Sequence, residues 1–271
     1  MTTHPDAQQR PAAAGVHRTP ASLVPLGHDV TVKGLKKSFG TTPIFQDVSF
    51  RLATGESLAL VGANGTGKST LLRCIVGLIP VSGGTVEVLG QHVNGATARD
   101  MRRLRAQTGL VAQKHNLVPR LSVLTNVIHG FLGQHSGPRY WSQSFAPATA
   151  RHAALASLEK VGLAHLADRR ADRLSGGQSQ RVAIARALVA KPKLLIADEP
   201  CASLDPSAGE EVMELFFRLM REDGVTVIFT SHHMEHALKY GDRVLGLAAG
   251  KVRLDATAQS LSIQDLRGLY D

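Results

Sequence analysis

The pattern of hydrophobic and polar positions changes sharply near residue 29. Before it, residues 1–28 scatter four prolines among Ala, Thr, Gln and His, without a continuous hydrophobic run. Such a segment buries too little apolar surface to offset the entropy lost on folding, so we predict a disordered tail over residues 1–28. The lack of a hydrophobic run also argues against a secretory signal in this segment.

From residue 29 onward, strand-like and helix-like patterns alternate along the chain. Half-buried strands, in which apolar and polar side chains alternate, are expected at 30–33, 48–52 and 85–89. Compact apolar runs, typical of buried parallel strands, occur at 57–61, 194–197 and 225–229. Helices are expected at 71–76, 99–105, 151–161, 178–189 and 210–221. Strands alternating with helices predict an α/β fold around a largely parallel sheet.

Composition narrows the possible classes of protein. Hydrophobic residues make up 43% and charged residues 20% of the 271 residues, which is ordinary for a globular protein. No run approaches the roughly 18 apolar residues that span a bilayer, so any membrane-spanning part should belong to other subunits. The net charge of +9 is compatible with nucleic acid, an anionic membrane surface or polyphosphate ligands. No base-reading pattern accompanies this charge, and we do not expect a nucleic-acid partner.

A glycine-rich segment directly after the apolar run 57–61 matches the pattern G-x-x-x-x-G-K-[ST]. It consists of Gly62, Ala63, Asn64, Gly65, Thr66, Gly67, Lys68 and Ser69, and Thr70 follows. An apolar strand before the pattern and a helix after it are the context that a phosphate-binding loop needs. Glycines let successive N–H groups point at phosphate oxygens, and the helix N-terminus adds positive potential. We predict that Lys68 binds the β- and γ-phosphates of a nucleotide and that Ser69 binds Mg²⁺.

Two carboxylates follow the second buried run, 194–197, at the expected C-terminal edge of the sheet. We predict that Asp198 belongs to the Mg²⁺ shell and that Glu199 polarises the attacking water as a general base. A solvent-exposed acidic turn is the alternative, and the phosphate loop elsewhere in the chain makes it the weaker one.

A third motif connects these segments to a known family. Leu174, Ser175, Gly176, Gly177 and Gln178 resemble the signature motif of the ABC ATPases. That family's other motifs follow in the same order, and the resemblance covers about residues 29–271. It implies an ABC-type ATPase with a mixed, largely parallel core sheet, an antiparallel β subdomain and an inserted helical subdomain at about 114–178.

The resemblance also implies roles for residues outside the phosphate loop. Phe39 matches an aromatic residue that stacks on adenine, with Phe in place of the more usual Tyr. Gln113 matches a catalytic-site glutamine that senses the nucleotide, joins Ser69 and Asp198 around Mg²⁺ and contacts the membrane partner. His232 matches the switch histidine that contacts the γ-phosphate, and His233 is the less favoured alternative. The loop that signals between subunits matches Ser203, Leu204 and Asp205.

The family resemblance implies a homodimer with ATP and Mg²⁺ held between subunits. Ser175 and Gly177 would contact the γ-phosphate of ATP bound to the other subunit, with backbone N–H groups and a helix N-terminus as donors. No internal repeat is visible in the sequence, so we expect one nucleotide-binding unit per chain.

The segment between Gln113 and Trp141 is similar to the ATP-binding subunits of phosphonate-type importers, a group that includes phosphite systems. This implies a transport-coupled ATPase of the translocase class on the cytoplasmic face of the bacterial inner membrane. Its partners would be permease subunits and a periplasmic or lipid-anchored substrate-binding protein. Trp141 and Phe131 could pack within the helical subdomain or contact the permease.

Three rival functions stay open at this point. The chain could serve an importer of another small solute, such as an amino acid. It could be an accessory subunit of a carbon–phosphorus lyase complex, without a transport role. A nucleic-acid-associated ATPase is a third possibility, although such relatives usually carry two nucleotide domains or long coiled-coil inserts.

Overall fold

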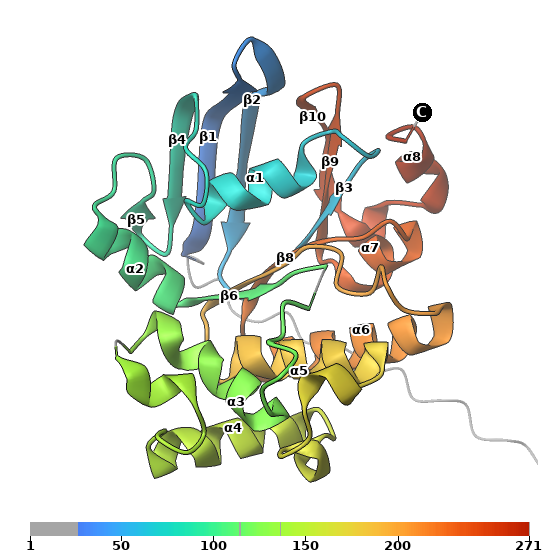
Figure 1. Cartoon of the computed structure of the whole chain (residues 1–271). Helices are drawn as coiled ribbons and strands as arrows, with labels where there is room; N and C mark the ends of the chain where they lie inside the picture. The colour runs from blue at the N-terminus through green and yellow to red at the C-terminus, as the bar shows by residue number, and fades with distance from the viewer. Residues whose placement is uncertain (1–26, 114, 136, 271) are drawn as a thin grey trace, which may run out of the picture.

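Two β-sheets organise the chain in this computed structural model, which describes residues 27–113, 115–135 and 137–270 (Figure 1). The first sheet is antiparallel and has the strand order β2 (Thr42–Ala53), β1 (His28–Phe39), β4 (Gly83–Val88) and β5 (Gln91–His92). The second sheet has the order β10 (Lys251–Thr257), β9 (Arg243–Ala248), β3 (Ser57–Val61), β8 (Thr226–Thr230), β7 (Leu194–Ala197) and β6 (Thr108–Val111). Its neighbours pair in parallel except for β10, which is antiparallel to β9. The predicted α/β fold with a mixed, largely parallel core sheet is confirmed.

Helices lie on both faces of the core sheet (Figure 1). In chain order they are α1 (Lys68–Ile75), α2 (Ala98–Ala106), α3 (Val123–Ile128), α4 (Ala148–Lys160), α5 (Gly176–Leu188), α6 (Pro206–Glu222), α7 (Met234–Tyr240) and α8 (Ile263–Arg267). In Figure 1 the antiparallel sheet stands at the upper left, and α3, α4 and α5 lie at the bottom. The short 3₁₀ helices η1 (His129–Gly133) and η2 (Pro138–Trp141) lie between α3 and α4 in the chain.

Strands β3, β7 and β8, in the middle of the core sheet, are buried at every position, which explains their mostly apolar sequences. Along β3, Leu58 and Leu60 point into a cluster shared with the antiparallel sheet and α1. Ala59 and Val61 point to the opposite face, into a cluster with α3, α5 and α6. Successive strand residues alternate between faces, so a strand covered on both sides is apolar at nearly every position, apart from polar residues that find hydrogen-bond partners.

The boundaries of several elements differ from the sequence expectations. Helix α5 begins at Gly176, not at 178, because Ser175 caps it. Strand β6 was not expected, since it has four residues and contains Gly109. A side chain at Gly109 would lie 3.0 Å from the carbonyl oxygen of Ala187, so the close approach of α5 favours glycine.

The predicted tail, 1–28, lies outside the described residues except for its last two positions. His28 belongs to β1, so this strand begins one residue before the predicted domain start at residue 29. Within the described residues, the structure contains no helix that is both long enough and apolar enough to cross a membrane.

Candidate active site

The phosphate loop connects β3 to α1 through two glycines that no other residue could replace without strain. Gly62 has φ 142°, and a Cβ there would lie 2.2 Å from the carbonyl oxygen of Leu247 on β9. Gly67, the N-cap of α1, has φ 96°, and a Cβ there would lie 2.7 Å from Cγ2 of Ile44. Both the backbone conformation and the close packing therefore require glycine at these positions. The result is a tight loop that ends at a helix N-terminus.

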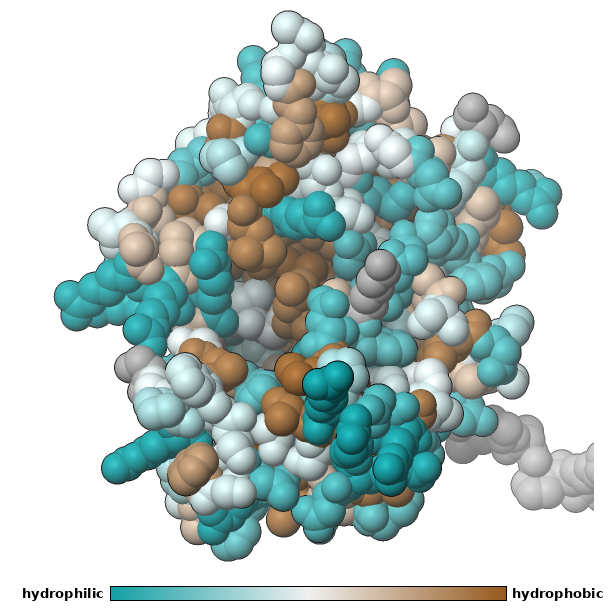
Figure 2. Space-filling view, in the orientation of Figure 1, coloured by the Kyte–Doolittle hydropathy of each residue, from teal (hydrophilic) through white to brown (hydrophobic). Residues whose placement is uncertain are grey.

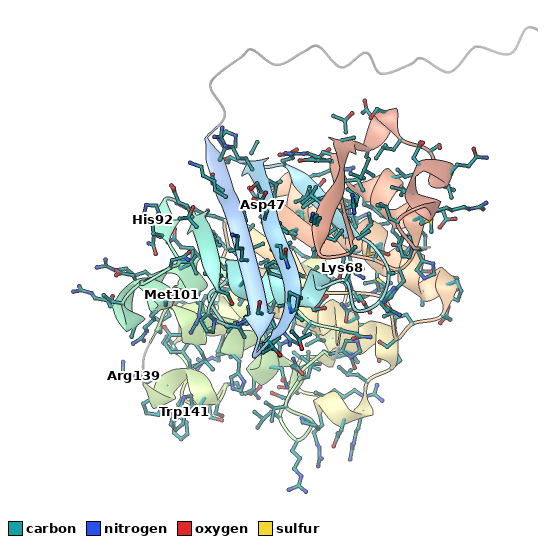
Figure 3. The ribbon with its side chains drawn as sticks, turned by 90° about the horizontal axis from the view of Figure 1, so that it is seen from above. Asp47, Lys68, His92, Met101, Arg139 and Trp141 are labelled. Atoms are coloured by element: carbon teal, nitrogen blue, oxygen red, sulfur yellow. The ribbon has the colours of Figure 1, made fainter. Side chains whose placement is uncertain are left out.

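Lys68 folds back over this loop and lies near the centre of the molecule in Figure 3. Its Nζ donates hydrogen bonds to the carbonyl oxygens of Gly62 at 2.7 Å and Ala63 at 2.9 Å, and the residue is only 6% exposed. Burial lowers the pKa of Lys68, and the negative charges of Glu199 and Asp198 oppose this effect. The loop thus encloses a partly desolvated cation, which would interact strongly with an anionic ligand.

Asp198 stands beside the phosphate loop at the C-terminal edge of the core sheet. Its Oδ1 accepts hydrogen bonds from the hydroxyls of Ser69 at 3.2 Å and Thr230 at 2.9 Å. Strands β7 and β8 pair in parallel with Ala197 opposite Phe229, which brings the next residues, Asp198 and Thr230, to the same edge. The sheet register therefore joins residues that lie more than 30 positions apart in the sequence.

Glu199 adopts a left-handed conformation, with φ 52°, directly after this strand. Its backbone N–H donates to Thr230 Oγ1 at 2.8 Å, and its Oε1 lies 2.6 Å from His232 Nε2. A non-glycine residue at positive φ is strained, and such strain is concentrated at functional sites. Both carboxylates therefore lie at one edge of the core sheet, where Asp198 meets Ser69 and Glu199 meets His232. The ring of His233 instead lies 4.9 Å from the ring of His236, so His232 is the histidine whose side chain reaches Glu199.

Gln113 and Phe39 lie at the surface in the described structure. Gln113 is exposed and follows β6 at the same edge of the core sheet that carries Asp198. Phe39 ends β1, is 51% exposed, and has the Lys37 Nζ 4.5 Å from the centre of its ring. The described hydrogen bonds do not tie either side chain to the Asp198 cluster. Their exposed polar or aromatic faces are available to a ligand.

The signature residues form a second polar surface, at the start of α5. Ser175 caps this helix: its Oγ accepts from the N–H of Gln178 at 3.3 Å, and its own N–H donates to Gln178 Oε1 at 3.1 Å. Leu174 immediately precedes this cap and is half-buried. A Cβ at Gly177 would meet open space, so its small size leaves the backbone accessible.

A hollow of about 490 Å³ joins the signature to the loop before α6. Its lining includes Ser175–Gln178 together with Ser203, Leu204 and Asp205. Asp205 caps α6, and the hydrogen bond from the Ala208 N–H, at 3.0 Å, contributes most to lowering the pKa of its carboxyl. Among the described residues that line this hollow, none belongs to the phosphate loop or to the Asp198–Glu199 edge. The chain thus carries two separate groups of predicted site residues.

Sequence reasoning missed two contributors to the site. Thr230 bonds both Asp198 and the N–H of Glu199; its signal was a polar residue ending a buried strand beside the carboxylates. The carbonyl oxygen of Leu269 accepts from the N–H of Ala63 in the phosphate loop at 3.3 Å. No local sequence pattern predicts this second contact, because it depends on where the C-terminal segment packs in the folded chain.

Comparisons with known proteins show which family this sequence resembles. The sequence profile of the ABC transporter family matches residues 45–202. The chain is 48% identical over 246 residues to the phosphate-import ATP-binding protein PhnC of Mycolicibacterium smegmatis, with 90% of this chain and 93% of that protein covered. It is 46% identical over 238 residues to the phosphonates import ATP-binding protein PhnC of Nocardia farcinica, with 88% of each covered.

A solved structure of an ATP-binding cassette has the same fold as this chain. The dimeric post-hydrolysis ATP-binding cassette MJ0796, bound to ADP and Pi, superposes with a TM-score of 0.73 and 31% sequence identity. The match covers 84% of this chain and 98% of that one. The chain therefore belongs to the ABC transporter family, as an ATP-binding subunit that hydrolyses ATP.

Proposed function

We propose that this chain energises an ABC importer of phosphonates or a related phosphorus oxyanion. The observation that carries this proposal is the identity of 46–48%, over about nine-tenths of the chain, to proteins named for phosphonate or phosphate import. One of these proteins is named for phosphate and the other for phosphonates. Both compounds are tetrahedral phosphorus oxyanions, and this is the cargo class that we propose. The hydrolytic subunit itself need not touch the cargo, because a receptor and a permease would select and carry it.

In the proposed reaction, water attacks the γ-phosphorus of ATP, and the bond to the β–γ bridging oxygen breaks. Glu199 accepts the proton of the attacking water, and His232, held 2.6 Å from Glu199, contacts the γ-phosphate. Lys68 and the loop N–H groups stabilise the charge on the phosphates. Support comes from the convergence of these groups on one edge of the sheet.

The donor atoms at this edge fit Mg²⁺. Ser69 Oγ and Asp198 Oδ1 are oxygen donors 3.2 Å apart, and Gln113 would add an amide oxygen from the same edge. Mg²⁺ prefers oxygen ligands and usually keeps waters and phosphate oxygens in its shell, so a protein site with few ligands is adequate. When bound with the nucleotide, the ion would neutralise phosphate charge.

The second group of residues suggests how two chains cooperate. Ser175 and Gly177 present a hydroxyl and an accessible backbone at a helix N-terminus, in a hollow separate from the chain's own phosphate loop. We propose that they bind the γ-phosphate of ATP held by a second copy of the chain. Ser203–Asp205 line the same hollow beside them. The related cassette MJ0796 has been solved as a dimer, which supports this arrangement.

A surface near α2 has the character of a permease contact. Trp141 is 64% exposed and lines a hollow of about 420 Å³ with Leu132, Arg102 and Arg105. In Figure 3, Trp141 and Arg139 project outward at the edge of the molecule. Figure 2 shows hydrophobic side chains around a depression in the middle of the face that it draws.

Phe131 differs from Trp141 in its surroundings. Its ring lies 5.9 Å from the ring of Tyr140 and packs against the core, so we assign it to packing within the helical segment. We assign Trp141 to the permease contact. A permease that spans the membrane would then bind this chain at its cytoplasmic face. A substrate-binding protein on the outer side would complete the importer.

The test is uptake of labelled methylphosphonate, phosphite and phosphate by cells that carry the whole transporter. Each is measured with the wild-type subunit and with Glu199→Gln. We expect uptake of at least one compound with the wild type and its loss with the variant. Preference for phosphate over methylphosphonate would assign the cargo to the type named for the M. smegmatis relative.

Uptake of none of the three compounds, with intact ATP hydrolysis by the purified chain, would contradict the cargo and favour another small solute. Co-purification with soluble lyase subunits in place of a permease would favour the accessory role in carbon–phosphorus bond cleavage. Stable binding to nucleic acid in moderate salt would revive the third rival, because purely electrostatic binding weakens steeply with salt.

A further inference from the structure

Another histidine lies beside the turn Ser231–His233, which carries the proposed switch histidine, and has no part in the chemistry proposed above. His236, on α7, has a side chain that is only 12% exposed. It lines a hollow of about 150 Å³ together with Glu199, Ser231 and His232. A nearly buried imidazole this close to the reacting edge is held by specific partners, and those partners define what it can do.

The first partner of His236 is a carboxylate on α6. His236 Nε2 lies 3.0 Å from Glu210 Oε2. Glu210 also accepts hydrogen bonds from Lys239 and, at 2.6 Å, from the hydroxyl of Tyr240, and these bonds lower its pKa to about 2. An ionised carboxylate can only accept, so Nε2 of His236 carries a proton and donates a hydrogen bond to Glu210.

The second partner of His236 is Ser231, whose Oγ lies 3.3 Å from Nδ1. Burial lowers the pKa of His236, and the nearby Glu210 charge opposes this shift. In the neutral ring with a protonated Nε2, Nδ1 is an acceptor, so the Ser231 hydroxyl donates to it. The carboxylate thereby fixes both the tautomer and the direction of the serine hydroxyl.

Ser231 also bonds the backbone of the turn that carries His232. Its Oγ also accepts the backbone N–H of His233 at 3.1 Å, a hydrogen bond that spans two residues and closes a serine turn. The middle residue of that turn is His232, whose Nε2 lies 2.6 Å from Glu199 Oε1. A continuous series of hydrogen bonds therefore runs from Glu210 through His236 and Ser231 to the bend that carries His232.

We propose that His236 is a positioning residue, which holds the Ser231 turn and so presents His232 to the reacting edge. This inference rests on the proposed roles of Glu199 and His232. The described side-chain hydrogen bonds of His236 go to Ser231 and Glu210 and not to the phosphate loop or Glu199, so its loss should lower kcat and leave the KM for ATP nearly unchanged. Small misplacements of catalytic groups cost as much as about 100-fold in rate, and we expect a decrease of about 10-fold for His236→Ala.

Two near-isosteric variants separate positioning from simple packing. The amide of Asn lies where Nδ1 lies, so His236→Asn keeps the bond to Ser231 and loses the bond to Glu210. The amide of Gln lies where Nε2 lies, so His236→Gln keeps the bond to Glu210 and loses the bond to Ser231. We expect kcat of His236→Asn to approach the wild type, and kcat of His236→Gln to fall nearly as far as that of His236→Ala.

The Ser231 step has its own test. Ser231→Ala should lower kcat as much as His236→Ala does, and the double variant should lose no more, since both substitutions break the same series of bonds. Thermal unfolding of every variant checks that the fold persists. His165→Asn and His165→Gln, at an exposed histidine on η3 (Ala164–Leu166), serve as controls that should keep the wild-type kcat.

The positioning role is overturned if His236→Gln keeps the wild-type kcat, if His236→Asn falls below His236→Gln, or if the Ser231→Ala and His236→Ala effects simply multiply. Glu199→Gln in the same assay separates this inference from the proposed function. Wild-type turnover by Glu199→Gln overturns the proposed chemistry. Loss of turnover there, with wild-type turnover in all His236 variants, overturns only the positioning role.

Discussion

At the scale of single residues, the reacting edge is held together by hydroxyl groups. Thr230 is fully buried and bonds Asp198 Oδ1 at 2.9 Å and the N–H of Glu199 at 2.8 Å. One side chain thereby fixes the predicted metal ligand and the strained backbone of the predicted general base. A buried polar group that loses its partner costs free energy, so this residue links stability with chemistry.

We therefore predict that Thr230→Val, which keeps the shape and removes the hydroxyl, lowers both stability and kcat. The unpaired carboxylate oxygen and N–H should cost about 1–3 kcal/mol of unfolding free energy. Chemical denaturation and steady-state ATPase assays measure the two effects. Thr230→Ser keeps the hydroxyl and should retain most of the wild-type kcat. A wild-type kcat in Thr230→Val would show that this hydroxyl does not organise the site.

At the scale of elements, helix α5 combines a structural cap with an exposed polar surface. Ser175 and Gln178 satisfy each other's backbone N–H groups in a capping box, the usual solution for a helix start. The same N-terminus lies in the hollow that we assign to the nucleotide of a second chain. A substitution at Ser175 can therefore be designed to alter one property and spare the other.

Ser175→Ala and Ser175→Asp separate these two properties. Alanine removes the cap and should cost about 1 kcal/mol, a decrease in Tm of about 2–4 °C. Aspartate is a good N-cap and should keep the Tm, but its negative charge would repel a γ-phosphate. Both variants, placed in the Glu199→Gln background, should fail to dimerise with ATP in size-exclusion chromatography. An ATP-dependent dimer of the Ser175→Asp form would contradict the assigned contact.

How far the sequence predicts each element depends on whether its signal is local. The run 57–61 coincides with β3, because a strand buried on both faces leaves a continuous apolar sequence. The signal of the phosphate loop is also local, because its glycines and Lys68 are close in sequence. Helix α3 was not expected: its six residues are all buried, which erases helical periodicity. Thr230 and His236 act through contacts with other elements, and no sequence spacing encodes those contacts.

At the scale of the whole molecule, the two predicted polar surfaces and the exposed apolar surface have different roles. The phosphate loop and the signature lie apart within one chain, and we propose that a second chain completes each of them. Trp141, in contrast, lies beside Leu132 and two arginines at the rim of a separate hollow. Exposed aromatic residues next to arginine are typical of protein interfaces, which supports a permease partner there.

Trp141→Ala should reduce transport without reducing the basal ATPase activity of the purified chain. An interface aromatic of this kind contributes about 2 kcal/mol or more, which corresponds to about 30-fold weaker association with the permease. Pull-down of the permease and cellular uptake measure the effect, and Trp141→Phe should restore part of both. Normal uptake and normal pull-down with Trp141→Ala would place the permease contact elsewhere.

The most direct test of the account is ATP turnover by purified Glu199→Gln, with the oligomeric state followed in the same samples. General-base catalysis contributes about 100- to 10,000-fold, so we predict turnover at least about 100-fold below the wild type. ATP should still bind and should trap a dimer in size-exclusion chromatography. Glu222→Gln, at an exposed glutamate ending α6, is the matched control and should behave as the wild type. Turnover by Glu199→Gln at the wild-type rate would contradict the assignment of Glu199 and the mechanism built on it.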